Sequence, residues 1–434
     1  MDKMADVLGR AGAWCGQNKY LSAIKNAFQN FMPLTIAGAI GVLWCNVLVN
    51  ESTGLGMFFK PIMALDFLNP AFQAVNFCTI SCITVGITLG IAQEIGIWNM
   101  GAERAGYIPG LVGLAAWLSV TNTSHMVDGA KEAFTGIAGN ELGATGLFTG
   151  MIIGVLSVEL FCFFEKQDAL KIKMPEQVPP GVARAFEVLV PATITLIITA
   201  CIGSACYNLT GLYLNDVIKN GIQGPLGAVG ATIPGVMIIY LVIMLFWLVG
   251  IHGNNMLSAV KEALFTPLAL ENVEKFNKGE KPTNIINMYA LQMWGEFGGS
   301  GVTIGLVIAI MIFGKREDNK AIATLSLVPG LFNINETVTF GIPMVLNPIL
   351  GIPFVVAPLI TIIIGYVLTV IGFCPVACLT VPWTTPPIVF GFLACGANVM
   401  GAVTQAILIV VSTVIYVPFL ISYEKYQNKQ AVEA

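Results

Sequence analysis

Apolar runs long enough to cross a lipid bilayer recur along this chain, and they limit its fold more than any other feature. The runs near 31–49, 144–164, 186–207 and 402–421 approach the roughly 20 residues that a helical crossing needs. Within a bilayer, an α-helix satisfies every backbone hydrogen bond inside its own segment. The runs therefore predict an all-α polytopic membrane protein.

Composition supports this class and excludes others. Hydrophobic residues make up 56% of the chain and charged residues 11%, whereas a soluble domain carries roughly a quarter charged residues. The net charge of -4 is spread along the chain without a basic patch, so we expect no nucleic-acid partner. The ten cysteines form no C-x-x-C pair and have no histidine at ligand spacing, so we expect neither a metal site nor a cofactor.

About ten transmembrane helices are expected in all. The polar segment 165–184 carries four basic residues, and the expected outside loops carry at most one each. By the positive-inside rule, both termini are then cytoplasmic. The segment 251–270 is half polar and is typical of a re-entrant or interfacial helix. The expected spans are 31–49, 71–92, 107–120, 144–164, 186–207, 226–250, 287–313, 341–350 with its flanks, 354–373 and 402–421.

A row of glycines marks the fourth of these spans. Gly146, Gly150 and Gly154 recur every four residues, which lets another helix approach closely. The sequence leaves open whether this row packs within the subunit or against a second subunit.

The stretch 331–348, LFNINETVTFGIPMVLNP, departs from the pattern of a simple span. It carries the carboxylate of Glu336, the amide of Asn335 and helix-interrupting Gly341 and Pro348 within apolar sequence. An ionisable group at membrane depth is costly and normally faces a cavity or a partner, and broken backbone at that depth is tolerated only where it is buried in protein or lines water. We therefore interpret Glu336 as a functional group; the alternative is a structural carboxylate bonded to neighbouring amides.

His252 is the second ionisable candidate. It stands in G-I-H-G-N-N at the end of a span, between Gly250 and Gly253, which permit a sharp turn. An imidazole can donate, accept or carry a proton near neutral pH. The alternative is a helix-end histidine that reaches interfacial water.

An aromatic residue between prolines is the third element. Trp383 in V-P-W-T-T-P-P is followed by the hydroxyl of Thr384. An aromatic face against a sugar ring, with hydroxyl groups near its edge, is a sensible carbohydrate site. Tryptophan is also enriched at membrane interfaces, so this signal alone is weak.

Motifs of soluble catalysis are missing from the sequence. There is no G-x-x-x-x-G-K-[ST] phosphate loop, no H-E-x-x-H and no G-x-S-x-G. No stretch between the spans is long enough for a soluble catalytic domain. Transport is the function that remains best supported.

Taken together, the motifs resemble those of a known family. The chain is similar to the membrane (IIC) components of the bacterial phosphoenolpyruvate-dependent sugar phosphotransferase system, in the lactose/cellobiose/chitobiose branch. The resemblance rests on A-I-K-N-A-F and F-M-P-L-T-I-A-G-A within 23–39, P-E-Q-V-P-P-G-V-A-R-A-F at 175–186, G-I-H-G at 250–253, G-G-S-G at 298–301, F-N-I-N-E-T-V-T-F-G-I-P-M-V-L-N-P at 332–348 and P-W-T-T-P at 382–386.

The resemblance implies an architecture and a location. It implies a multi-pass homodimer in the bacterial cell membrane, with an amino-terminal helical part, 1–210, that forms the dimer. It assigns sugar binding and transport to a carboxy-terminal part, 225–425, with two re-entrant hairpins near 252–270 and 321–340.

The resemblance also implies site residues and a partner. His252 and Glu336 would hydrogen-bond the sugar, and Glu336 would lie near the hydroxyl that is phosphorylated. Phosphoryl groups would come from a phosphocysteine on a separate cytoplasmic IIB protein. With these two residues, the expected substrate-binding set is Gly253, Asn254, Asn335, Trp383 and Thr384.

The expected function is thus a permease that binds a β-linked disaccharide, translocates it and presents it for phosphorylation. The alternative is a secondary sugar transporter coupled to protons or sodium, in which His252 and Glu336 would handle protons. Dependence of uptake on phosphoenolpyruvate rather than on an ion gradient would discriminate the two. The sequence does not identify the disaccharide.

Overall fold

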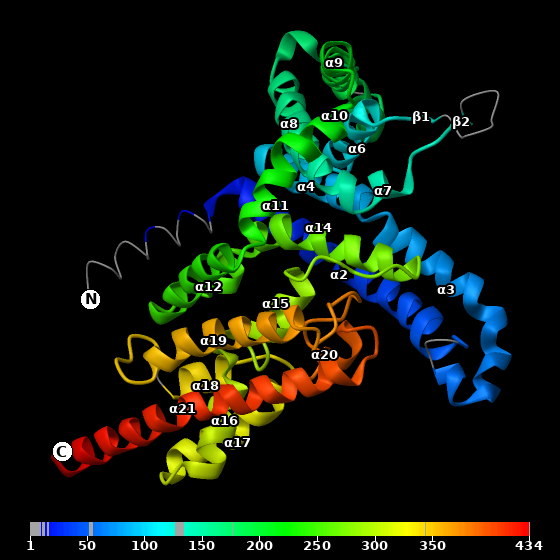
Figure 1. Ribbon diagram of the computed structural model, residues 1–434. Coiled ribbons are helices and arrows are strands. Elements are labelled where there is room, and N and C mark those ends of the chain that lie inside the picture. The colour runs from blue at the N-terminus through cyan, green and yellow to red at the C-terminus, as the bar shows by residue number, and fades with distance from the viewer. Residues whose placement is uncertain are drawn as a thin grey trace. The chain divides into compact units, whose positions relative to one another are not determined.

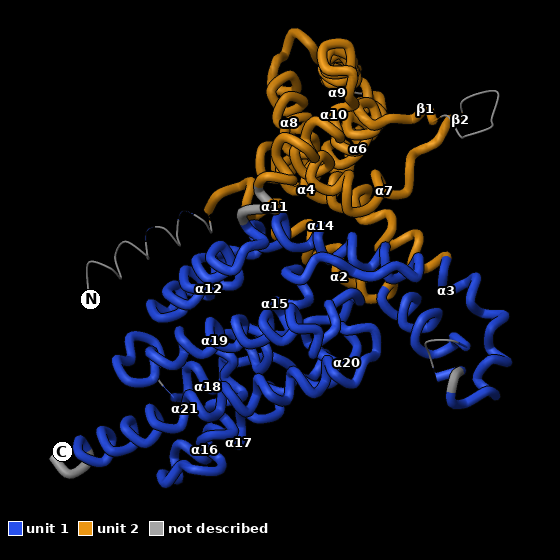
Figure 2. Tube along the Cα trace, viewed as in Figure 1, with its two compact units in different colours: residues 1–16, 39–73, 228–434 blue, residues 17–38, 74–227 orange. Residues whose placement is uncertain are grey.

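The computed structural model describes residues 10, 14, 17–51, 55–125, 134–175, 177–342 and 344–433; Pro343 of the interrupted stretch lies outside them. Helices dominate the described chain (Figure 1). Strands β1 (Ser124–His125) and β2 (Phe134–Thr135) pair antiparallel. The chain divides into two compact units (Figure 2): unit 2 holds 17–38 and 74–227, and unit 1 holds 1–16, 39–73 and 228–434.

Unit 2 is a helical bundle built around three apolar helices. It contains most of α2 (Lys19–Leu43), then η4 (Phe77–Ser81), α4 (Ile83–Met100), α5 (Ala102–Ala105), α6 (Ile108–Val120), β1, β2, α7 (Gly139–Leu142), α8 (Ala144–Glu165), η5 (Asp168–Leu170), α9 (Pro180–Thr210), α10 (Leu214–Ile218), η6 (Lys219–Gln223) and the start of α11 (Gly224–Gly230). Helices α4, α6 and α8 pack against one another. Trp117 of α6 is buried in their core with Ile153 of α8.

The glycine row of α8 packs within the subunit. A Cβ atom at Gly150 would lie 2.2 Å from Oγ1 of Thr88 on α4, and one at Gly154 would lie 3.1 Å from the Thr88 carbonyl oxygen. Small residues at these positions therefore allow α8 to approach α4 closely. Of the two interpretations left open by the sequence, packing within one chain accounts for Gly150 and Gly154.

Two polar contacts join α2 to other helices of unit 2. Nζ of Lys19 lies 2.6 Å from Oε1 of Glu159, and the Asn26 amide donates to Glu94 at 2.8 Å. Buried charges are tolerated when they are paired and hydrogen-bonded. The ion pair of Glu159 with Lys19 therefore joins α8 to α2.

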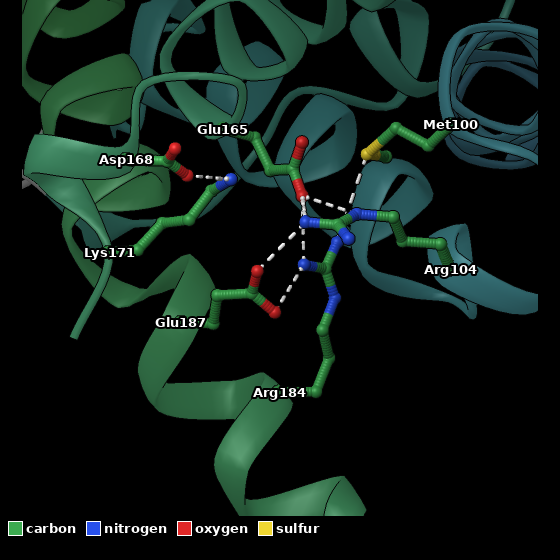
Figure 3. A network of polar contacts seen from close by, with 7 residues as sticks. All are labelled: Met100, Arg104, Glu165, Asp168, Lys171, Arg184 and Glu187. Carbon is green, nitrogen blue, oxygen red and sulfur yellow. Dashed lines mark hydrogen bonds and ion pairs between the residues drawn. The ribbon is translucent and has the colours of Figure 1, made fainter. Parts of the chain in front are cut away.

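A larger charged cluster lies where α5, α8 and α9 meet (Figure 3). The Glu165 carboxylate, whose side chain is 3% exposed, contacts Arg104 at 2.8 Å and Arg184 at 2.9 Å. Glu187 in turn pairs with both arginines. Two carboxylates thus balance two guanidinium groups, so this cluster serves to join three helices.

Unit 1 contains the interrupted helices. Its elements are η1 (Trp44–Leu48), η2 (Leu55–Met57), η3 (Lys60–Leu68), part of α3 (Asn69–Asn76), α12 (Ile233–Leu248), α13 (Gly253–Met256), α14 (Ser258–Asn277), α15 (Met288–Gly295), η7 (Ser300–Val302), α16 (Ile304–Phe313), α17 (Glu317–Leu331), α18 (Glu336–Gly341), α19 (Gly351–Val370), α20 (Val389–Ala394) and α21 (Val399–Glu433). Helix α21 packs against α16, α19 and α20, and α19 also packs against α12.

The predicted span 287–313 is broken in its middle. The chain bends by 60° between the part that ends at Val302 and the part that begins at Ile304. Gly298, Gly299 and Gly301 have φ values of 69°, 86° and 80°, a region that residues with a side chain rarely enter. These glycines therefore permit the break.

The expected span near 341–350 is wrong. Helix α18 ends at Gly341, and the described residues from there to α19 form turns and irregular backbone without a helix. The Asn347 side chain accepts hydrogen bonds from the backbone N–H groups of Ile349 and Leu350, both at 2.9 Å. Such local side-chain bonds compete with helix formation.

Among the described residues, five helices are long and apolar enough to cross a membrane, or up to seven if each bent pair counts as one span. The protein is therefore a multi-pass helical membrane protein. The shorter apolar helices Ile108–Val120 and Ile233–Leu248 coincide with expected spans but are shorter than a full crossing.

Candidate functional site

Two ionisable side chains from distant parts of the sequence meet in unit 1. His252 precedes α13, and Glu336 is the first residue of α18. The Nε2 atom of His252 lies 3.8 Å from Oε1 of Glu336, and their side chains are 37% and 47% exposed. The separation exceeds a normal hydrogen bond, so each side chain can form a hydrogen bond with a ligand hydroxyl group. The two principal residues predicted from the sequence therefore lie side by side.

The orientation of His252 is set by its own helix. Its Nδ1 atom accepts a hydrogen bond from the Asn255 backbone N–H at 3.3 Å, which caps α13. A neutral imidazole that accepts at Nδ1 carries its proton at Nε2. The ring also lies 4.5 Å, centroid to centroid, from that of Trp247. The side facing Glu336 thus presents an N–H donor.

Gly253 allows the backbone after His252 to approach α12 closely. A Cβ atom at this position would lie 2.0 Å from the Ile243 carbonyl oxygen of α12. Because that contact is with backbone, no side-chain movement could relieve it. Gly253 was predicted to bind substrate, and the structure also gives it this packing role.

Asn254 and Asn335 both contact Ser300. The Asn254 amide donates to the Ser300 hydroxyl at 3.2 Å, and the Asn335 amide donates to the Ser300 carbonyl at 3.0 Å. Oδ1 of Asn254 is buried and has no hydrogen-bond partner among the described residues. A buried amide oxygen in this state can accept from a ligand hydroxyl.

The loop that carries Trp383 is joined to the Glu336 segment. The Asn333 amide donates to the carbonyl oxygens of Trp383 at 2.5 Å and Thr385 at 3.1 Å. Trp383 is 43% exposed, and Thr384 beside it is half-buried. The Asn333 side chain thus ties the backbone on both sides of Thr384 to the segment that carries Glu336, three residues before the carboxylate.

Sequence reasoning did not single out Ser300 or Trp247. Ser300 lies in the G-G-S-G motif, but a serine between glycines does not by itself indicate a contact with two asparagines far away in the sequence. Trp247 lies five residues before His252 within a uniformly apolar helix. The motif at 298–301 was the only signal that could have directed attention to Ser300.

Three features together indicate the class of protein. The helices are long and apolar enough to span a membrane, an imidazole lies beside a carboxylate, and the backbone near these two groups is broken. Polar groups at interrupted helices are typical of substrate sites in membrane transporters. The fold and this arrangement together are typical of a multi-pass transporter, and they make the polar groups of unit 1 the candidate substrate site.

Comparison with known proteins identifies the particular family. The family model described as "Phosphotransferase system, EIIC" matches residues 25–358. The oligo-beta-mannoside-specific EIIC component of Bacillus subtilis strain 168 is 32% identical, over 100% of this chain and 97% of the relative. The cellobiose-specific EIIC component of Lactococcus lactis subsp. lactis strain IL1403 is 30% identical, over 98% of each chain.

A solved structure agrees with these sequence relatives. The crystal structure of the transporter ChbC, the IIC component of the N,N'-diacetylchitobiose-specific phosphotransferase system, superposes with a TM-score of 0.88 at 29% identity and covers 96% of both chains. The chain described here belongs to the phosphotransferase system EIIC family. This membership favours phosphotransfer-linked uptake over the ion-coupled alternative.

Proposed function

We propose that this EIIC component binds a β-linked disaccharide of the cellobiose, chitobiose or lactose type, translocates it and presents it to a phosphorylated IIB protein. The substrate class follows from relatives whose names specify oligo-beta-mannosides, cellobiose and diacetylchitobiose. The single structural observation that supports the site is the 3.8 Å separation of the His252 and Glu336 side chains.

Glu336 and His252 have complementary roles in this proposal. The Glu336 carboxylate accepts a hydrogen bond from the sugar hydroxyl and takes its proton as phosphate arrives. The sugar oxygen forms a bond to phosphorus, the bond between phosphorus and the IIB cysteine sulfur breaks, and the thiolate leaves. His252 donates from Nε2 to a second hydroxyl and fixes the ring, with Gly253, Asn254 and Asn335 around it.

Trp383 and Thr384 complete the proposed site. The exposed indole stacks on the apolar face of one sugar ring, and the Thr384 hydroxyl lies near the ring edge. Phosphorylation on the cytoplasmic side traps the product as an anion, so uptake proceeds in one direction without an ion gradient.

The proposal extends to the architecture. We assign dimer formation to 1–210, and sugar binding and transport to 225–425, with re-entrant hairpins near 252–270 and 321–340. About ten crossings place both termini in the cytoplasm, where the IIB partner is found. Movement of the transport part against a fixed dimer would carry the sugar across.

Replacement of Glu336 by glutamine tests the proposed chemistry. Sugar affinity and phosphorylation rate are measured in parallel on purified protein, with radiolabelled cellobiose, lactose and diacetylchitobiose and with phosphorylated IIB. We expect Glu336→Gln to bind its disaccharide within about tenfold of the wild type, because the amide oxygen still accepts a hydrogen bond. Phosphorylation should fall by about 10²–10⁴, because the amide cannot take a proton.

Glu317→Gln is the matched control, since Glu317 is 89% exposed on α17; neither measurement should change. Wild-type phosphorylation by Glu336→Gln would remove the proposed role of Glu336. Absence of binding to all three disaccharides by the wild type would contradict the substrate class.

A further inference from the structure

The segment Glu296–Gly301, here called the glycine loop, receives contacts from the side of the site that carries His252. Nζ of Lys261, on α14, forms an ion pair with Oε1 of Glu296, which also accepts a hydrogen bond from the Tyr240 hydroxyl at 2.7 Å. Lys261 lies 5.5 Å from the Tyr240 ring centroid. The Asn254 contact with Ser300 adds a second connection, two residues after His252.

The same loop receives contacts from the side that carries Glu336. The backbone N–H of Gly298 donates to Oδ1 of Asn333 at 2.6 Å, and Asn335 donates to the Ser300 carbonyl. A Cβ atom at Gly299 would lie 2.7 Å from Cβ of Asn335. The loop and the residue before Glu336 are therefore in direct contact.

The loop is itself held firmly. The Tyr416 hydroxyl of α21 donates to the Gly301 carbonyl at 2.7 Å, and the Thr303 hydroxyl donates to the Gly298 carbonyl at 2.6 Å. These two bonds restrain the middle and the end of the loop, so we expect the loop to move together with the segments that contact it.

We propose that the glycine loop is the positioning element that sets the separation of His252 and Glu336, and that the Lys261–Glu296 ion pair holds the His252 side of the site to it. Lys261 and Glu296 are positioning residues in this inference and do not contact the sugar. The inference rests on the proposed function, because it concerns the same disaccharide site.

Removal of one charge from the Lys261–Glu296 ion pair should disturb the site. Its side chains are 7% and 16% exposed. Removal of one partner from a buried pair leaves an uncompensated charge and is strongly destabilising, whereas replacement of both partners by neutral groups is often tolerated. The unpaired charge would draw water or a new partner, and the loop would shift with it.

A double-mutant cycle tests the inference on the full-length purified protein. The variants are Lys261→Met, Glu296→Gln and the combination of both, and the readouts are the disaccharide Kd and the thermal midpoint Tm. We expect each single variant to weaken binding by at least about tenfold, and the double variant to fold and to bind within about threefold of the wild type. Lys278→Met with Glu274→Gln, an exposed pair at the carboxy-terminal end of α14, is the matched control and should leave both readouts unchanged.

The outcomes separate the possible roles. A double variant that binds as weakly as Glu296→Gln would overturn the inference, since Glu296 would then act on the sugar itself. If the single variants have an unchanged Kd and a lowered Tm, the ion pair is purely structural and the inference is overturned. A double variant that fails to fold would overturn the inference as well. Failure of the wild type to bind any of the three disaccharides would instead count against the proposed function.

Discussion

At the scale of single residues, neighbours orient the groups proposed to hold the sugar. His252 is fixed by the Asn255 backbone N–H and by Trp247, and Asn333 holds the carbonyl oxygens of Trp383 and Thr385. Catalytic geometry of this kind requires supporting contacts, because small displacements of a reacting group are costly. A substitution in a supporting residue should therefore alter function without removing a group that touches the sugar.

Trp383→Ala tests the proposed stacking contact. Loss of an aromatic face should weaken disaccharide binding by about tenfold, or ~1.4 kcal/mol. Equilibrium binding to purified protein measures the change. Trp98→Ala, at a 57% exposed tryptophan of unit 2, is the control and should bind like the wild type. Equal affinity of Trp383→Ala and the wild type would exclude the stacking role.

At the scale of elements, glycine is used in two different ways. In the row on α8 it allows close helix packing, while in the glycine loop it allows backbone with positive φ. Substitution should therefore have different consequences. A side chain in place of a packing glycine on α8 would clash with Thr88. A side chain in place of a loop glycine would clash with its neighbours and would also strain the backbone.

Gly150→Ala tests the packing role. Alanine normally stabilises a helix by roughly 0.5–1 kcal/mol relative to glycine. At position 150 the added methyl would lie 2.2 Å from Oγ1 of Thr88, so we expect a net destabilisation of about 1–3 kcal/mol. Thermal unfolding in detergent measures it. Gly181→Ala, where no atom lies within 4 Å of the added Cβ, should be neutral or stabilising; equal Tm changes would contradict the packing role.

At the scale of the whole molecule, the chain separates into a unit without the site and a unit with it. The site residues all belong to unit 1, which also contains 39–73 from the amino-terminal part of the sequence. Helices α2 and α3 each have residues in both units, so they connect the two units along the chain.

Membrane orientation is a prediction at this scale. By the positive-inside rule, the basic residues in 165–184 and the expected count of about ten crossings predict that both termini are cytoplasmic. Green fluorescent protein fused after Ala434 should therefore fluoresce in cells, because it matures in the cytoplasm. Alkaline phosphatase inserted between β1 and β2 should be active, since this region is expected outside. A dark carboxy-terminal fusion with an active phosphatase at the same end would reverse the orientation.

The sequence predicted the helical membrane class and the principal polar residues. Glu336 and His252 were found because ionisable groups are rare in apolar sequence and costly there. Their separation, however, depends on Ser300, Lys261 and Glu296, whose contacts are made across long stretches of chain. Sequence spacing carries no signal for such contacts.

Element boundaries were predicted less well. The span expected near 341–350 failed because apolar composition does not report the local hydrogen bonds of Asn347. The role of the glycine row on α8 could not be decided either, since spacing of four fits any close helix partner. The helix boundary near 341–350 and the packing partner of the glycine row could be determined only from the residues that lie close to them in the folded structure.

The capped imidazole has a consequence for stereochemical selectivity. Rotation of the His252 ring would break its bond to the Asn255 N–H, so the Nε2–H bond has one direction in space. Glucose and galactose are epimers that differ only in whether the 4-hydroxyl is equatorial or axial. A donor with a fixed direction can satisfy one of these arrangements well and the other poorly, so the single turn of backbone after His252 would contribute to the choice of epimer.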